Sequence, residues 1–474
     1  MPAPSRLRLR PVEGHALRAA FAQIRDELGV SAAFRPEVRA AAVDAAARPR
    51  PPAVDRTDLE LVTIDPPGSM DLDQAVHVSR HGDGHRLNYA IADVAAFVTA
   101  GDQVDRESFR RGQTLYAPDG RIPLHPPELS EGAASLLEGQ DRPAVLWTVD
   151  VSSDGTIVDI DVVRALVRSR ARLDYETVQQ HLDAGTADDA LVALRELGRV
   201  LQEAERRRGG IDLPAPEQEV VADAGRYHLE FRSRRPVEGW NAQMSLLTGR
   251  AAAALMLDAR VGILRTLPEA PPEGVEQLRR AATVLDIDWG PAESYADVVR
   301  RCDATEPAHL AFLQQATVLL RGSGYTPFAG AAPETSWHAG VAAQYAHVTA
   351  PLRRLVDRFG TECALAACRG EEPPEWAVAA LPELPAVMTA SDRLAGALER
   401  ATIDVVEAAV LAPYVGETFE AVVVEASTDA GTVALRTPAV RARCAGKALP
   451  VGQRVVVRLA EASFDDRKVR FELA

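Results

Sequence analysis

Residues 62–74, Val-Thr-Ile-Asp-Pro-Pro-Gly-Ser-Met-Asp-Leu-Asp-Gln, are the stretch around which this chain is organised. A short β-branched run ends at Asp65, a turn follows, and Asp71 and Asp73 come directly after it. Carboxylates this close together repel one another unless a cation or hydrogen-bond donors offset their charge. Mg²⁺ is a hard cation that takes oxygen ligands, so the segment favours a magnesium site. A plain acidic turn is the alternative, and other segments have to decide between the two.

Composition narrows the class of protein. The 474 residues suffice for a large catalytic domain with one or two small modules. A net charge of −15 argues against a generic nucleic-acid coat protein, which would be basic, but allows an enzyme with a locally basic channel. The cysteines follow neither a metal-ligand nor a disulfide pattern, so we expect free thiols. Because neither a membrane span nor a signal-peptide core is visible, we expect a cytoplasmic protein.

Periodicity and turn residues divide the chain into three predicted parts. These are a short helical extension, an α+β catalytic domain and a small all-β barrel, at residues 1–57, 58–412 and 413–474. Strand patterns at 59–65 and 75–80 place the acidic loop between two strands. The short alternating strands of the last part are typical of an OB-type barrel, a common module for single-stranded nucleic acids, although such a barrel can also serve packing alone.

Two groups of arginines, one in the amino-terminal extension and one within the α+β domain, each invite two interpretations. Arg6, Arg8 and Arg10 could belong to an RNA-contacting arm or to a solvated extension. Residues 345–354, Tyr-Ala-His-Val-Thr-Ala-Pro-Leu-Arg-Arg, enter a helix predicted over 351–368. Two arginines in the first turn are misplaced in the field of the helix dipole unless an anion joins them. The alternative is a surface arginine pair with carboxylate partners.

Taken together, these segments resemble the RNB-domain ribonucleases, the family of bacterial ribonuclease II and ribonuclease R, in a short form without N-terminal cold-shock domains. Residues 63–75 are similar to the family's acidic motif, and 116–123, Tyr-Ala-Pro-Asp-Gly-Arg-Ile-Pro, to its Tyr-x-Pro loop. Residues 345–354 are similar to its Tyr-x-His-x-Thr-Ser-Pro-Ile-Arg-Arg signature, and 172–175 resemble another tyrosine site. The resemblance implies an RNB catalytic domain, in which a mixed β-sheet packs with helices, followed by an OB-fold barrel.

The resemblance also implies an activity, namely 3′→5′ hydrolysis of single-stranded RNA to nucleoside 5′-monophosphates with Mg²⁺ or Mn²⁺. It gives Asp65, Asp71 and Asp73 the role of catalytic metal ligands, with Gln74 as a further candidate ligand. Arg353 would stabilise the transition state. Tyr116 would stack on the terminal base, and Tyr175 and Arg354 are further candidates for RNA contact. We expect a monomer whose partner is single-stranded RNA.

Several positions depart from the family pattern. Gln74 stands where the family usually has a second consecutive Asp, and Asn241 and Ala242 stand where glutamates usually precede the residue matching Met244. An amide can ligate Mg²⁺ but brings no charge, so metal affinity should fall. Two alternatives to the exoribonuclease therefore stay open. One is a catalytically weakened RNA-binding protein of the same family, and the other is a metal phosphohydrolase acting on small nucleotides.

Overall fold

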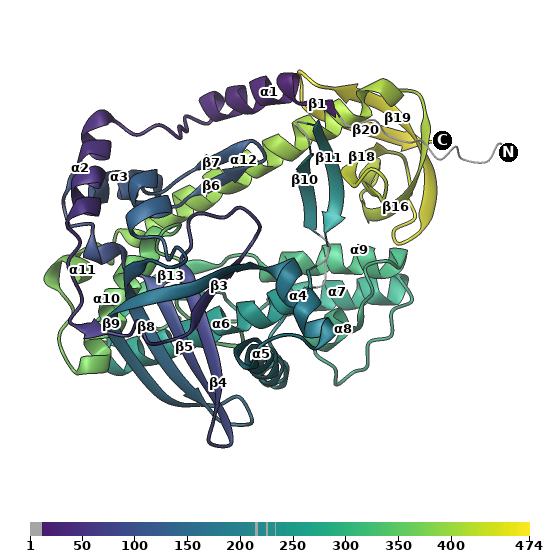
Figure 1. Ribbon diagram of the computed structural model, residues 1–474. Helices are drawn as coiled ribbons and strands as arrows, with labels where there is room; N and C mark the ends of the chain where they lie inside the picture. Colours follow the sequence, from purple (N-terminus) through teal and green to yellow (C-terminus); the bar gives the residue numbers. More distant parts are fainter. Residues whose placement is uncertain (1–11, 214–216, 224–225, 233) are drawn as a thin grey trace.

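The computed structural model describes residues 12–213, 217–223, 226–232 and 234–474. Figure 1 shows a large α+β body and a small barrel, with two helices, α1 (Gly14–Glu27) and α12 (Leu384–Leu411), running from one to the other. A mixed domain followed by a closed barrel is the fold class that the sequence predicted. Arg6, Arg8 and Arg10 lie outside the described residues.

A curled sheet forms the centre of the large body. Its strand order is β2-β9-β3-β4-β5-β8, and β9 also pairs with β8. The strands are β2 (Val54–Asp55), β3 (Leu61–Asp65), β4 (Gln74–His81), β5 (Gly84–Ala92), β8 (Asp141–Val151) and β9 (Ile157–Asp174). Because the long β9 pairs with β8 along its first part and with β3 along its last, the sheet closes on itself. The acidic loop leaves this rigid frame between β3 and β4, as predicted.

Helices bury both faces of the sheet. On one face, Tyr89 and Trp147 pack in a cluster with Leu197 and Met244 from α5 (Asp189–Arg208) and α6 (Pro236–Ala259). A second cluster joins the other face to α2 (Pro36–Ala47). Further elements of the body are α3 (Gln103–Arg111), α4 (Tyr175–Ala184), β12 (Val261–Thr266), α7 (Pro272–Val284), α8 (Tyr295–Arg301), α9 (Pro307–Ala316), β13 (Gly324–Ala329), β14 (Trp337–His338), β15 (Ala343–Gln344), α10 (Leu355–Arg369) and α11 (Glu375–Ala380).

The carboxyl-terminal barrel is closed, with strand order β16-β17-β18-β20-β19. Its strands are β16 (Thr418–Ala426), β17 (Ala430–Leu435), β18 (Val440–Ala445), β19 (Arg454–Ser463) and β20 (Lys468–Leu473). The helix α1 packs with α12 and the barrel in one apolar cluster, and Glu27 forms an ion pair with Arg467 of the barrel at 2.7 Å. A small sheet of β1 (Val12–Glu13), β11 (Arg226–Arg232) and β10 (Glu217–Asp223) lies beside them. The amino-terminal helices thus join the two bodies.

One predicted boundary was wrong. The helix predicted over 351–368 begins at Leu355, so Arg353 and Arg354 precede it. The backbone N–H groups of both arginines donate to the Ala350 carbonyl, at 3.2 Å and 2.9 Å, which forms a separate turn. Asp357 in the first helical turn accepts the Ala350 N–H at 2.7 Å and ties that turn to α10. The arginines therefore lie on a loop, where their direction is set by these contacts.

Candidate active site

Asp73 and Arg353 are far apart in the sequence and meet in the site. The Asp73 side chain is buried, with 5% of the residue exposed. The Leu352 N–H donates to its Oδ1 at 2.7 Å, and Arg353 Nε lies 3.5 Å from its Oδ2. Burial nevertheless dominates and raises the pKa of Asp73 to about 8. The contacts with Leu352 and Arg353 therefore do not offset the cost of burying the charge of Asp73.

Asp65 at the end of β3 is the second uncompensated carboxylate. Its carboxylate forms no hydrogen bond or salt bridge with any of the residues that the structure describes, whereas its backbone belongs to the β3–β9 ladder. Burial, and then the neighbouring charge of Asp71, raise the pKa of Asp65 to about 6, while Arg353 lowers it. Two carboxyl groups with raised pKa values in one place are the arrangement that a bound cation would relieve.

Asp71 is already engaged by a residue that the sequence reasoning missed. Arg121 forms an ion pair with Asp71 and a second one with Glu131, the latter at 2.9 Å. Arg121 lies directly opposite Tyr116 in the hairpin of β6 (Leu115–Ala117) and β7 (Gly120–Ile122). The Pro-Asp-Gly turn between these residues was the signal that could have placed both side chains over the acidic loop.

The hairpin presents Tyr116 to the site with an exposed ring. The residue is 55% exposed, and its hydroxyl donates to Asp71 Oδ2 at 3.4 Å. Arg25 of α1 anchors the hairpin, because its guanidinium makes two hydrogen bonds to Asp119 at 2.7 Å and 3.0 Å. An exposed aromatic ring on a fixed hairpin suits stacking on a nucleobase.

Tyr175 lies at the start of α4, near Asp65. Its hydroxyl is 3.4 Å from the Asn241 amide nitrogen, which donates to it. Burial, followed by the charge of Asp65, raises the pKa of Tyr175. The two predicted tyrosines thus lie near different carboxylates of the acidic loop, Tyr116 at Asp71 and Tyr175 near Asp65.

The two arginines that the sequence paired have different surroundings. Arg353 is 43% exposed at its side chain and is directed at Asp73. Arg354 makes two hydrogen bonds to Asp357, at 2.9 Å and 2.8 Å, and the Asp357 side chain is fully buried. Arg354 therefore has the carboxylate partner that the sequence analysis gave as the alternative for this arginine pair. Of the two arginines, Arg353 is the one that faces Asp73.

Gln74 makes its contacts inside the protein. Its amide nitrogen donates to the Thr349 carbonyl at 2.7 Å, and its oxygen accepts a hydrogen bond from the Tyr89 hydroxyl. Whether Gln74 ligates a metal stays a prediction, but its oxygen already has a partner.

The side chains of the acidic loop suit a single hard cation better than a cluster of several metal ions. Across the described parts of the chain, no three His, Cys, Asp or Glu side chains are arranged as a ready-made metal group. Asp65 and Asp73 nevertheless offer carboxylate oxygens with little compensation, whereas Arg121 occupies Asp71. Mg²⁺ commonly keeps several waters and is held by one or two carboxylates together with substrate phosphates. The donor set therefore fits such an ion.

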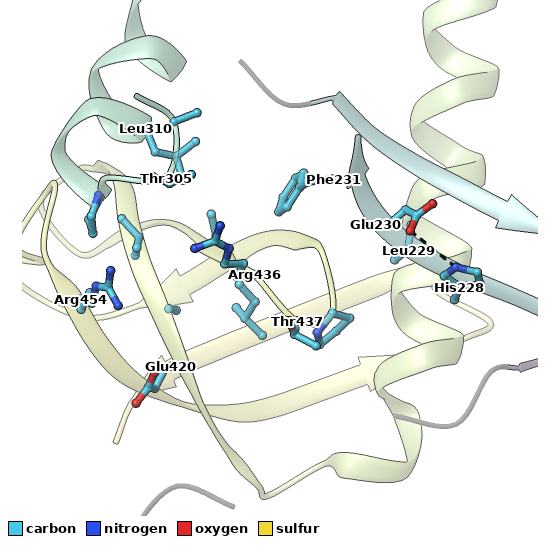
Figure 2. A pocket seen from close by; sticks show the side chains of 17 residues that line it. His228, Leu229, Glu230, Phe231, Thr305, Leu310, Glu420, Arg436, Thr437 and Arg454 are labelled. Atoms are coloured by element: carbon cyan, nitrogen blue, oxygen red, sulfur yellow. Dashed lines mark ion pairs between the residues drawn. The ribbon is translucent and has the colours of Figure 1, made fainter. Parts of the chain in front are cut away.

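A separate cavity of about 550 Å³ lies where the barrel meets α9 and β11. Figure 2 shows Phe231, Arg436 and Arg454 around it, and it shares no lining residue with the acidic loop or the Arg353 segment. None of the helices that the structure describes is both long and apolar enough to cross a membrane.

Comparison with protein families agrees with this site. The model of the RNB domain matches residues 54–359, and that of the RNase II-type exonuclease C-terminal S1 domain matches residues 417–474. The chain belongs to the RNB-domain family. The resemblance predicted from the motifs is thereby confirmed, and the matched span contains all the predicted site residues. The domain boundaries that we placed after residues 57 and 412 stay predictions.

Individual relatives and solved structures resemble the RNB-domain chain to different extents. Ribonuclease R of Escherichia coli (strain K12) is 32% identical over 320 residues, which cover 64% of this chain and 39% of that protein. The apo form of Mycoplasma genitalium RNase R has a TM-score of 0.86 at 19% identity, over 97% of this chain and 78% of that one. Yeast Ssd1, described as a pseudonuclease, has a TM-score of 0.74 at 15% identity, over 94% and 59%. The two structures share the fold, and the chain spans well under half the length of E. coli ribonuclease R.

Proposed function

We propose that this RNB-domain protein is a Mg²⁺-dependent 3′→5′ exoribonuclease that hydrolyses single-stranded RNA to nucleoside 5′-monophosphates. The observation that carries the proposal is the meeting of Asp73 and Arg353, with Tyr116 exposed beside them. A protein that only binds RNA has no need of buried carboxylates beside the path of a phosphate. The polarity and the products rest on the family and on relatives named ribonuclease R and exoribonuclease 2.

The acidic loop would hold the cation. Asp65 and Asp73 are its proposed ligands, and Asp71 joins them if Arg121 releases it. A divalent ion bound there supplies positive charge for the phosphate oxygens and lowers the pKa of a water molecule that can attack phosphorus. Mn²⁺ takes the same oxygen ligands and is a suitable substitute.

Arg353, which lies beside Asp73, would act on the same phosphate. Hydrolysis adds negative charge to the oxygens around phosphorus, and a planar guanidinium can donate two hydrogen bonds to them. The exposed side chain of Arg353 can reach a substrate while its backbone stays fixed, because Thr114 N–H donates to the Arg353 carbonyl at 2.9 Å. Tyr116 would hold the terminal base by stacking, without regard to base identity. Tyr175 would line the other side of the RNA end.

A specific group of contacts favours the second candidate, a catalytically weakened RNA-binding protein. Asp71 is paired with Arg121, the Gln74 oxygen is used by Tyr89, and Asn241 contacts Tyr175. These positions offer a cation less charge than three free carboxylates would. The activity of the chain thus depends on whether Asp65 and Asp73 suffice.

One assay separates the candidates. Single-stranded RNA labelled at either end is incubated with Mg²⁺, Mn²⁺ or EDTA and with wild type, Asp73→Asn, or the control Asp83→Asn, whose carboxylate lies on an exposed turn. We expect monophosphates from the 3′ end with either metal, in wild type and control only. RNA binding without cleavage would support the weakened protein, and cleavage of mononucleotide substrates alone would support a small-molecule phosphohydrolase. Cytoplasmic location and a monomeric state stay predictions.

A further inference from the structure

We propose that Gln74 is a positioning residue, which holds the loop carrying Arg353 against the acidic loop, and that it is not a metal ligand. We call residues 349–353 the arginine loop. The inference concerns the site of the proposed function and rests on that function for its effect on rate. Its structural part rests on the contacts of one side chain that joins segments 275 residues apart.

The Gln74 amide uses both of its ends. Its nitrogen donates to the Thr349 carbonyl at 2.7 Å, and its oxygen accepts from the hydroxyl of Tyr89. Tyr89 is 1% exposed, and its phenol hydroxyl is the donor in this contact. Ser245 closes the group, with its Oγ 2.9 Å from the Tyr89 hydroxyl and 3.5 Å from the Gln74 oxygen. The one oxygen that could ligate a metal is thus directed at the sheet.

Only a side chain with both a donor and an acceptor satisfies this position. A carboxylate at residue 74 could accept from Tyr89, but it would face the Thr349 carbonyl as a second acceptor. Thr349 is 3% exposed, so water has little access to its backbone as a replacement donor. The Gln74 amide therefore suits its two protein partners, Tyr89 and Thr349. This accounts for an amide beside Asp73 without making Gln74 a metal ligand.

Two adjacent residues at the start of β4, Asp73 and Gln74, hold the two ends of the arginine loop. Gln74 holds its first residue, Thr349, and Asp73 accepts the N–H of Leu352 at 2.7 Å, next to Arg353. Asp357 holds the middle of the loop through the Ala350 N–H. Because a guanidinium acts on a transition state only in the right place, freeing one end of the loop should lower the rate.

The test compares Gln74→Leu and Gln74→Glu with the control Gln23→Leu, which removes an exposed amide that donates to Glu27 at 2.8 Å. Three quantities are measured for each variant. Calorimetric titration gives Mg²⁺ affinity without RNA, hydrogen exchange gives the protection of the amides at 352 and 353, and kinetics on a short RNA give kcat and KM. Gln74→Glu is nearly isosteric and serves as the second variant if leucine disturbs folding.

We expect both Gln74 variants to exchange the loop amides faster, by about 10- to 100-fold, because neither donates to Thr349. Gln74→Leu should keep the Mg²⁺ affinity of wild type within about twofold, and kcat should fall with little change in KM. The control should match wild type throughout.

Two outcomes would overturn the inference. A loss of Mg²⁺ affinity of about tenfold or more in Gln74→Leu, with loop exchange unchanged, would make Gln74 a ligand. Unchanged exchange and unchanged kcat in both variants would make it a bystander. If wild type releases no monophosphate, the proposed function fails, but exchange and Mg²⁺ affinity still decide the role of Gln74.

Discussion

Replacing Asp73 with asparagine should raise the stability of the metal-free protein and abolish its activity. Burial raises the pKa of Asp73 from 3.8 to about 8 in the folded protein without metal. The folded state therefore keeps a proton that the unfolded chain releases, and the free energy of unfolding of the metal-free protein falls as the pH rises from about 4 to 8. At pH 7 the solution lies about 3 units above the unfolded pKa, which corresponds to at most about 4 kcal/mol at 1.36 kcal/mol per unit.

Asparagine has nearly the same shape and no charge. Its Oδ1 can still accept the Leu352 N–H, which lies 2.7 Å from Asp73 Oδ1. The lost contact with Arg353, at 3.5 Å and with a side chain 43% exposed, should cost little. We therefore expect metal-free Asp73→Asn to be more stable than metal-free wild type at pH 7, by about 2–4 kcal/mol, and to be inactive.

Urea unfolding in EDTA, at pH values from 5 to 8, measures this difference directly. The wild-type stability should decline across the range and that of Asp73→Asn should stay nearly level. Mg²⁺ should then stabilise wild type by mass action and leave the variant unchanged. Parallel pH profiles, or a variant less stable than wild type in EDTA at pH 7, would refute the view that Asp73 is a buried and poorly compensated carboxylate.

Three further predictions concern the partners of the acidic loop and the junction of the two bodies. Arg353→Lys should lower the single-turnover rate by about 10²–10³-fold, with less effect on RNA affinity, because lysine cannot donate from a planar fork. Tyr116→Ala should weaken the binding of short RNA by about 1–3 kcal/mol in a titration, while the Mg²⁺ dependence of cleavage stays the same. At the junction of α12 with the barrel, burial raises the pKa of Glu407 to about 7, so wild-type stability should fall as the pH rises from about 4.5 to 7. Glu407→Gln should flatten that part of the melting-temperature profile, because its oxygen can still accept the Arg441 N–H, 3.0 Å from Glu407 Oε1.

The sequence predicted the segments of the site better than their contacts. Period-two patterns and turn residues gave the strands on either side of the acidic loop and the closed barrel, because these signals are local. Motif resemblance then brought together Asp73, Arg353 and Tyr116, which the structure places around one point. Local sequence patterns and the order of the family motifs were thus sufficient to predict the strands, the barrel and these three site residues.

The sequence did not predict which side chains pair in the site, because these contacts depend on how distant segments fold together. Arg121 follows a turn and looks like an ordinary surface residue until the hairpin folds over Asp71. The pairing of Arg354 with Asp357 depends on where α10 begins, and the predicted helix began four residues too early, at 351 instead of Leu355. The contact of Gln74 with Thr349 joins two loops across the fold, and no local periodicity encodes such a contact.

The charges around the acidic loop give the proposed cation a role in binding as well as in hydrolysis. Asp65, Asp71, Asp73 and Glu131 bring four carboxyl groups to the site, and Arg121 and Arg353 bring two guanidinium groups. Once a bound cation keeps all these groups ionised, the carboxylates exceed the guanidinium groups by two negative charges, and a phosphate would add to that charge. One divalent ion cancels the excess, so RNA should enter a site that is close to neutral. We therefore expect EDTA to release short RNA from the slow Arg353→Lys protein in a fluorescence titration. If RNA affinity is the same with and without Mg²⁺, the cation is not needed for binding, and Arg353 variants would then have to be explained by chemistry alone.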